Sequence, residues 1–320
     1  MRQALRVAFA LAALLLLILA TMRQWDDFVA AVAELDATAV TVSFAAVLAA
    51  LVLNMLAWRE AMAAVDIHVS LAASARVFYL SQLGKYVPGS VWPVVAQMEL
   101  TRDTGVSRVR GATGAIVAMV VGVATSSAVA STLLVLPHAE IRSRYWWVVA
   151  VVPVVGAALH PAVLRRLLAP LFRVTRRSPQ LPTLNGAALL RATAWSAGMW
   201  LALGAHAYVL TERLASPRTA PFLIVTGAMA FAWVVGFLVV LAPAGLGVRE
   251  GALTLALATV VPTSGALALA VVSRVLMTLG DAAAAGVVIL LHRYSHHRSQ
   301  RRSSTALPEP PLSEGRSSED

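Results

Sequence analysis

The chain contains no cysteine, a single lysine and few charged residues of any kind. Of its 320 residues, 13% are charged and 59% are hydrophobic. The absence of cysteine excludes disulfides, thiolate metal sites and a catalytic thiol. So little charge would leave a soluble fold unable to cover its apolar surface, which excludes a soluble globular protein. The composition predicts an all-α polytopic integral membrane protein.

Motifs for nucleotide, metal or hydrolytic chemistry are also absent. The sequence has no Asp-x-Asp, no glycine-rich phosphate loop ending in Lys-Ser/Thr and no His-Glu-x-x-His. We therefore expect no cofactor, no metal site, no catalytic residue and no enzyme activity, and any transport to be downhill or coupled to an ion gradient. Glu99 and Asp103 are the only acidic pair worth testing for catalysis, and a carboxylate pair alone is weak support.

Apolar runs that can cross a bilayer dominate the chain, since a helical span needs roughly 20 residues. These runs are Leu5 to Ala20, Ala39 to Trp58, Gly111 to Leu136, Tyr145 to Leu159, Ala192 to Leu210, Pro221 to Leu241 and Ala266 to Leu291. The segments too short to cross alone are Leu71 to Leu83, Val91 to Leu100 and Val248 to Val261. Irregular backbone at membrane depth must be buried in protein or line a wet cavity. The chain thus predicts about seven to eight full spans plus re-entrant or broken helices.

Arginine-rich loops predict the orientation, because Lys and Arg accumulate on the cytoplasmic side. The arginine-rich stretches are 59–76, 102–110, 165–177 and 293–302, whereas the loop 23–36 is acidic. Both termini are then cytoplasmic if 71–100 enters and returns on one side and 248–261 supplies one further crossing. The net charge of +10 reflects this topology and attraction to anionic headgroups, and we expect no nucleic-acid partner.

The two ends of the chain carry separate predictions. Arg2 and Arg6 precede an apolar run, as in a secretory signal, but no small-residue cleavage site follows it. We expect this run to be a retained anchor. Residues 1–294 then form one transmembrane domain, and the polar residues 295–320 predict a disordered cytoplasmic tail.

Two interruptions place proline, glycine and charge inside sequence otherwise suited to the membrane. The first, Gln82 to Trp92, contains Lys85, the single lysine of the chain. The second, Leu241 to Gly251, contains Arg249 and Glu250 side by side. Charges at helix breaks inside a membrane indicate a functional site, because a charge at the bilayer centre costs at least about 3 kcal/mol.

A lipid headgroup that moves between leaflets needs an internal polar path, and the two breaks offer one. Lys85 and Arg249, beside exposed backbone N–H groups, are suited to hold a phosphate. Glu99 and Glu250 can pair with these cations or attract a cationic headgroup. Lys85 and Arg249 as simple interfacial anchors remain the alternative. The predicted lipid-binding set is Lys85, Pro88, Gly89, Trp92, Glu99, Pro243, Gly245, Gly247, Arg249 and Glu250.

Arg274 and Asp281 lie seven residues apart on the last span, hence on nearly one helix face. We predict an intramembrane pair that locks helices together, with a relay or gate as the alternative.

Each half of the chain also contains a Pro/Gly break, a short apolar segment, a glycine-containing turn and a long span. This similarity between the halves is expected of an inverted repeat around a midplane site, and a chance similarity of two unrelated segments explains it equally well.

The stretches Leu83 to Trp92 and Pro243 to Gly251 resemble the signature stretches of the lysylphosphatidylglycerol synthase transmembrane family. That family includes the flippase domain of the multiple peptide resistance factor. The resemblance covers most of the chain, from the first span to the last. It implies a multi-pass, flippase-like protein of the bacterial cytoplasmic membrane that binds or translocates an anionic, aminoacylated or polyprenyl-phosphate lipid.

One departure limits what the resemblance implies. The chain ends in a short polar tail with no room for an aminoacyltransferase domain, so lipid synthesis is not expected. Two alternatives stay open: a non-transporting scaffold for a glycosyltransferase or lipid-synthesis partner, and a membrane-embedded polyprenyl-phosphate glycosyl-transfer enzyme. A scaffold tolerates the loss of Arg249 and Glu250, whereas a flippase does not.

Overall fold

The computed structural model describes residues 22, 25–86, 92–135, 143, 146–174, 183–214, 221–239, 247–258 and 260–305. All regular elements within these residues are helices. They are α2 (Trp25–Ala33), α3 (Ala37–Ala64), α4 (Leu71–Gln82), η1 (Leu83–Tyr86), α5 (Trp92–Arg102), α6 (Arg108–Val135), η2 (Trp146–Ala150), α8 (Val151–Leu159), α9 (Pro161–Val174), α10 (Gly186–Leu214), α11 (Phe222–Leu238), α12 (Val248–Leu257) and α13 (Thr263–Thr305). The first predicted span, Leu5 to Ala20, lies outside the described residues.

Three helical stretches are long and apolar enough to cross a membrane: α3, α6 and residues Thr263–Tyr294 of α13. Two further apolar helical stretches, Trp146–Leu159 and Phe222–Leu238, are shorter. The prediction of a helical, membrane-embedded protein is therefore confirmed. The total of seven to eight spans stays a prediction.

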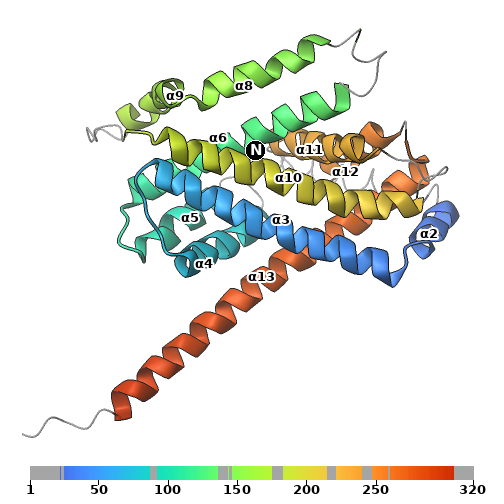
Figure 1. The fold of residues 1–320 in the computed structure, drawn as a ribbon. Helices are drawn as coiled ribbons and strands as arrows, with labels where there is room; N and C mark the ends of the chain where they lie inside the picture. Colours follow the sequence, from blue (N-terminus) through green and yellow to red (C-terminus); the bar gives the residue numbers. More distant parts are fainter. Residues whose placement is uncertain are drawn as a thin grey trace, which may run out of the picture.

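Three long helices form the frame of the bundle (Figure 1). α3 packs along α10, and α6 packs against both. Asp36, the N-cap of α3, forms an ion pair of 3.1 Å with Arg213 near the end of α10. At the opposite end of α3, Glu60 lies 2.8 Å from Arg191 near the start of α10. These two ion pairs show that α3 and α10 are antiparallel.

α4 and η1 precede the first predicted break and α5 follows it, and α4 packs against α5 as in a hairpin. Arg76 of α4 lies 3.1 Å from Asp103, just after α5, so the open ends of the hairpin are adjacent. Arg110 of α6 donates to the carbonyl of Asp66, just after α3, at 2.7 Å. The hairpin therefore begins and ends where α3 ends and α6 begins, which is the re-entrant course predicted for 71–100.

The second predicted break lies between α11 and α12, which pack along each other. The ring of Phe222, at the start of α11, contacts the ring of Tyr208 of α10 edge to face at 5.6 Å. The start of α13 also adjoins this end, because a Cβ on Gly265 would lie 3.2 Å from the Leu214 carbonyl oxygen. The α11–α12 hairpin therefore opens at the C-terminal end of α10, opposite to the first hairpin.

α12 runs in the direction that one further crossing requires, but it is short. Its 10 residues extend about 15 Å, roughly half of the hydrocarbon core. Val248 to Val261 is thus the returning arm of a hairpin and does not cross alone. The two oppositely directed hairpins have the arrangement that an inverted repeat would produce.

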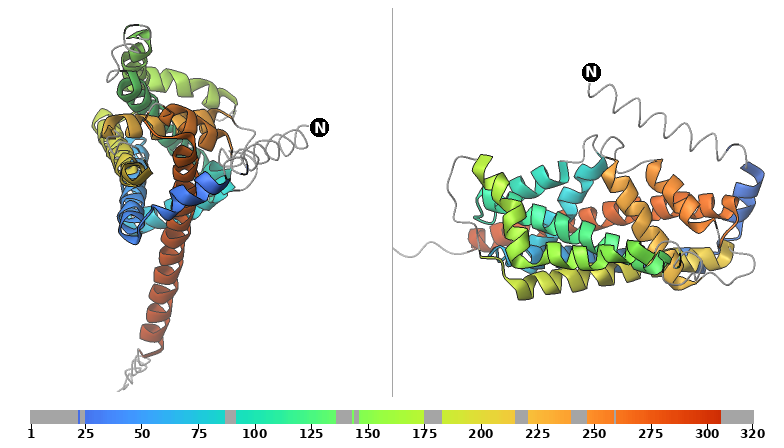
Figure 2. Two further views of the ribbon diagram at one scale, coloured as in Figure 1. Left: turned by 90° about the vertical axis from the view of Figure 1, so that its right-hand side faces the viewer. Right: turned by 90° about the horizontal axis from the view of Figure 1, so that it is seen from above.

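α13 is the longest described helix, with 43 residues. Its first part crosses the bundle, and its C-terminal part extends away from the other helices (Figures 1 and 2). The helix continues to Thr305, past Tyr294, where the sequence predicts a disordered tail to begin. Neither glycine nor proline interrupts residues 295–305, so no helix breaker ends it at the apolar boundary.

Close approach of α10 and α11 depends on a glycine. A Cβ built on Gly204 of α10 would lie 2.8 Å from the Cβ of Thr226 of α11. Gly198, on the same helix, has room, because its Cβ would lie 3.8 Å from Leu53. Small residues at such positions let membrane helices approach each other closely.

We expect Gly204→Ala to lower the free energy of unfolding by about 1–3 kcal/mol, because the methyl group overpacks the α10–α11 contact. The matched control Gly198→Ala should be neutral or stabilising, since alanine favours helix and meets no clash. Thermal unfolding of the purified variants in detergent measures both. Equal unfolding temperatures for the two variants would contradict the close α10–α11 contact.

Candidate functional site

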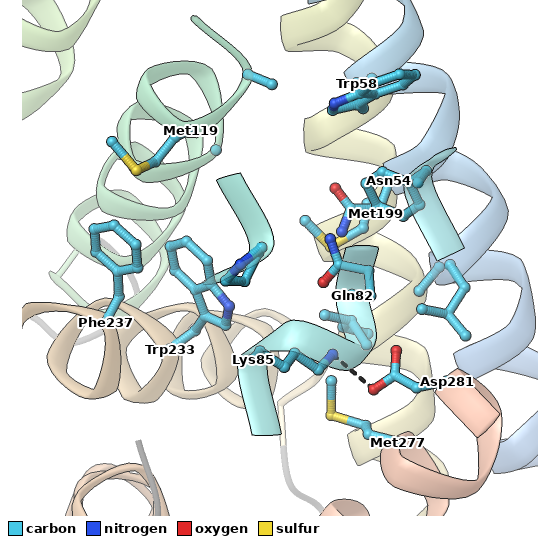
Figure 3. Close-up of a pocket in the computed structure, with 18 of the residues that line it drawn as sticks. Asn54, Trp58, Gln82, Lys85, Met119, Met199, Trp233, Phe237, Met277 and Asp281 are labelled. Carbon is cyan, nitrogen blue, oxygen red and sulfur yellow. Dashed lines mark ion pairs between the residues drawn. The ribbon is translucent and has the colours of Figure 1, made fainter. Parts of the chain in front are cut away.

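Described residues that flank the two breaks line a cavity of about 300 Å³ inside the bundle (Figure 3). The first hairpin contributes Gln82 and Lys85, and the second contributes Arg249. α13 closes one side with Arg274 and Asp281. The cavity thus joins four charged residues from three separate segments of the chain: the two predicted breaks and the last predicted span.

Lys85 lies near the start of the first break and points at α13. Its Nζ lies 2.6 Å from Oδ2 of Asp281, and the hydroxyl of Tyr86 donates to the same oxygen at 2.6 Å (Figure 3). The Asp281 side chain is 2% exposed, and its other oxygen, Oδ1, has no hydrogen-bond partner. Two adjacent residues of η1 are therefore attached to one carboxylate oxygen of α13, and the Tyr86 hydroxyl also lies 3.4 Å from Oγ1 of Thr278.

The second break starts α12 with a glycine that the backbone requires. Gly247 has a φ of 80°, a conformation that side chains disfavour, and it forms the N-cap of α12. Its N–H donates to Oε2 of Glu250 at 2.6 Å. Oε1 of the buried Glu250 lies 3.6 Å from Nη1 of Arg274. Glu250 thus caps its own helix and also holds α13, and it already uses one backbone donor that the sequence analysis reserved for a phosphate.

Arg249 is the cation whose charge is least compensated at this site. It lines the cavity, and its Nη2 lies 3.2 Å from the sulfur of Met277, a weak acceptor. No carboxylate of the described residues forms an ion pair with it. Among the described residues at this site, the three cations Lys85, Arg249 and Arg274 stand against the two carboxylates of Asp281 and Glu250, so positive charge is in excess. The site therefore favours an anion.

The rest of the wall is apolar, aromatic or neutral. Figure 3 shows Trp233 and Phe237 on the side away from Asp281. The indole N–H of Trp58 donates to Oε1 of Gln97 at 3.0 Å, which connects α3 to α5 beside the cavity. A ligand with a charged group and an apolar part would match both regions.

Part of the predicted lipid-binding set lies elsewhere or outside the described residues. Glu99 is exposed and binds Arg108 at 2.7 Å and Arg102 at 3.3 Å. The Arg108 guanidinium holds the pKa of the Glu99 carboxyl below its usual range. Glu99 pairs with neither Lys85 nor Arg249, because it sits at the far end of α5. Trp92 is exposed and does not line the cavity. Pro88, Gly89, Pro243 and Gly245 lie outside the described residues.

The predicted pair of Arg274 with Asp281 is corrected by the structure. Each residue does bind across helices, but Arg274 pairs with Glu250 and Asp281 with Lys85. Residues seven apart share a helix face yet lie about 10 Å apart along the axis, too far for direct contact of these side chains. The helix-locking role stands, with different partners.

Several residues of the cavity are absent from the set predicted from the sequence. Tyr86 could have been identified from the sequence, because it directly follows the single lysine. Gln97 and Trp233 could not, because nothing in their neighbourhood distinguishes a cavity wall from a buried helix face. Within the described ranges no group of three His, Cys, Asp or Glu side chains is placed to hold a metal.

A family model described as the lysylphosphatidylglycerol synthase TM region matches residues 3–285. The matched range contains both hairpins and every residue that lines the cavity. No curated protein matches the chain.

The ion pair between Lys85 and Asp281 should contribute measurably to stability. Asp281→Ala leaves the lysine without its carboxylate, and we expect a loss of about 3 kcal/mol in the free energy of unfolding, the lower end for a buried pair. The lower end applies because the Lys85 side chain is 31% exposed. Denaturant titration in mixed micelles measures the loss.

The double variant Lys85→Met/Asp281→Leu removes both charges and should recover most of that stability. The single variants Lys85→Met and Asp281→Leu complete the cycle. Additive losses in the double variant would show that the two side chains do not interact in the folded protein.

Proposed function

We propose that this chain, which belongs to the lysylphosphatidylglycerol synthase transmembrane family, binds a lipid with an anionic headgroup and moves it between membrane leaflets. The observation that carries the proposal is Arg249, a cation without a carboxylate partner among the described residues, which lines a net-positive cavity between two broken helices. Half-helices that meet near the middle of a membrane protein commonly form the substrate site of a transporter.

The excess of positive charge narrows the ligand class. A phosphodiester or polyprenyl phosphate would meet Lys85, Arg249 and Arg274, whereas the cationic headgroup of an aminoacylated lipid would meet like charge. The anionic lipid is therefore the favoured ligand.

The size of the cavity supports a headgroup as its content. About 300 Å³ is at the lower limit for small-molecule sites and too small for two acyl chains. The chains would stay in the surrounding hydrocarbon, where they need no polar path. Trp233 and Phe237 would then contact the first apolar atoms of the lipid.

We also propose that the arginine-rich end of the bundle faces the cytoplasm, with both termini on that side of the cell membrane. Arg76, Arg110 and Arg191 lie near the shared end of α3, α6 and α10, and the positive-inside rule favours this orientation. No enzymatic step forms part of the proposal.

Leaflet exchange in proteoliposomes tests the function. Fluorescent phosphatidylglycerol should exchange in vesicles that contain the wild type, and Arg249→Gln should slow this exchange by about 10–100-fold, the equivalent of one lost charged hydrogen bond. Chemical quenching of the outer leaflet measures the exchange. A polyprenyl-phosphate analogue tests the second anionic lipid, and a lysylated lipid should exchange more slowly.

Arg108→Gln is the matched control, because Arg108 pairs with Glu99 at the surface and such pairs contribute little. It should exchange lipid as the wild type does. Background exchange for every lipid, with wild-type folding, would refute transport and favour a scaffold for a partner enzyme.

A further inference from the structure

We propose that Asp281 is a proton-binding site and that the protein takes up one proton together with each monoanionic headgroup. This inference rests on the proposed anion-binding function and adds a co-substrate to it. It starts from the asymmetric contacts of one carboxylate.

Asp281 is buried, yet only one of its two carboxylate oxygens has a hydrogen-bond partner among the described residues. Lys85 and Tyr86 both contact Oδ2, each at 2.6 Å. Oδ1 has no partner, although the side chain is only 2% exposed. Buried carboxylate oxygens are normally hydrogen-bonded, and an oxygen without a donor is costly while the group is charged. A proton on Oδ1 removes this charge.

Asp281 also competes with the ligand for a cation. Its partner Lys85 lines the cavity and is suited to bind a phosphate, but it cannot serve two anions at full strength in one geometry. When Asp281 is neutral, the ammonium of Lys85 is released to the headgroup. Anion binding therefore favours the protonated form of Asp281, and protonation favours anion binding.

The charges balance in this exchange. A water-borne proton forms an O–H bond with Oδ1, which takes Asp281 from −1 to neutral, and Lys85 keeps its own proton throughout. A monoanionic headgroup then supplies the negative charge that Asp281 has lost. The total charge of the occupied cavity equals that of the empty one, so no uncompensated charge enters the membrane interior.

The other charged groups that line the cavity around Asp281 are cations, which carry their protons already. Asp281 is the only carboxylate among the described residues that line the cavity. η1 presents Lys85 and Tyr86, α12 presents Arg249, and α13 itself presents Arg274, which is held by a carboxylate outside the cavity lining.

Other helices that pack on α13 add no titratable group to the cavity. The lining residues from α3, α4 and α10 carry none. His206 of α10 binds Ser43 and Ser273 and does not line the cavity. The acids Asp26 and Asp27 of α2 are exposed.

Proton uptake on ligand binding tests the inference directly. Dioctanoyl phosphatidylglycerol is added to the full-length protein in weakly buffered detergent that contains a pH indicator. The phosphodiester of this lipid does not titrate near neutral pH. We expect about one proton taken up per lipid bound. Where this uptake is complete, the affinity should fall by about tenfold per pH unit, because the bound form holds the extra proton.

Three variants assign the proton. Asp281→Asn, which keeps an acceptor for Tyr86, should bind without uptake and with an affinity that is nearly independent of pH. Asp281→Glu should retain the uptake. Asp103→Asn, at a surface carboxylate paired with Arg76, should behave as the wild type, and thermal unfolding checks the fold of each.

Binding by the wild type without proton uptake would overturn the inference and leave the proposed function intact. Uptake that persists in Asp281→Asn would also overturn it, because another group then carries the proton. Absence of binding at every pH would refute the proposed function itself.

Discussion

A membrane interior cannot hold separated charges cheaply, and the structure meets this constraint with two ion pairs that end on one helix. Lys85 reaches Asp281 at 2.6 Å, and Glu250 reaches Arg274 at 3.6 Å. Each pair connects the tip of one broken-helix hairpin to α13. The described residues that flank both breaks are therefore held against α13. Irregular backbone can exist at membrane depth where protein surrounds it.

The same pairs leave the site unbalanced in charge. Arg249 lies beside the thioether of Met277 and lines the same cavity. A structural role alone would favour an apolar side chain here, since uncompensated charge is destabilising. Its position gives the cavity a preference for anions, while the aromatic wall opposite suits an apolar neighbour. The proposed affinity for an amphipathic anion rests on this division of the cavity wall.

Much of the fold could be predicted because it depends on local sequence. The lengths of the apolar runs predicted the helices, and proline and glycine marked both breaks. At the second break, Gly247 adopts the positive φ that the turn into α12 requires. Partners across helices could not be predicted. Arg274 and Asp281 share a face in any helix, but which segment that face meets depends on how the hairpins fold back. Glu99 shows the same limit, since nine residues further on Arg108 offers it a surface partner.

The spacing of seven residues between Arg274 and Asp281 fixes the distance between the two points at which α13 holds the hairpins. Two helical turns hold both side chains on nearly one face and about 10 Å apart along the axis, so this rise sets how far apart the two hairpin tips are held. An insertion of one residue between them would rotate one side chain by about 100° and withdraw it from its hairpin. The length of this segment is therefore constrained more strictly than the identity of the apolar residues within it.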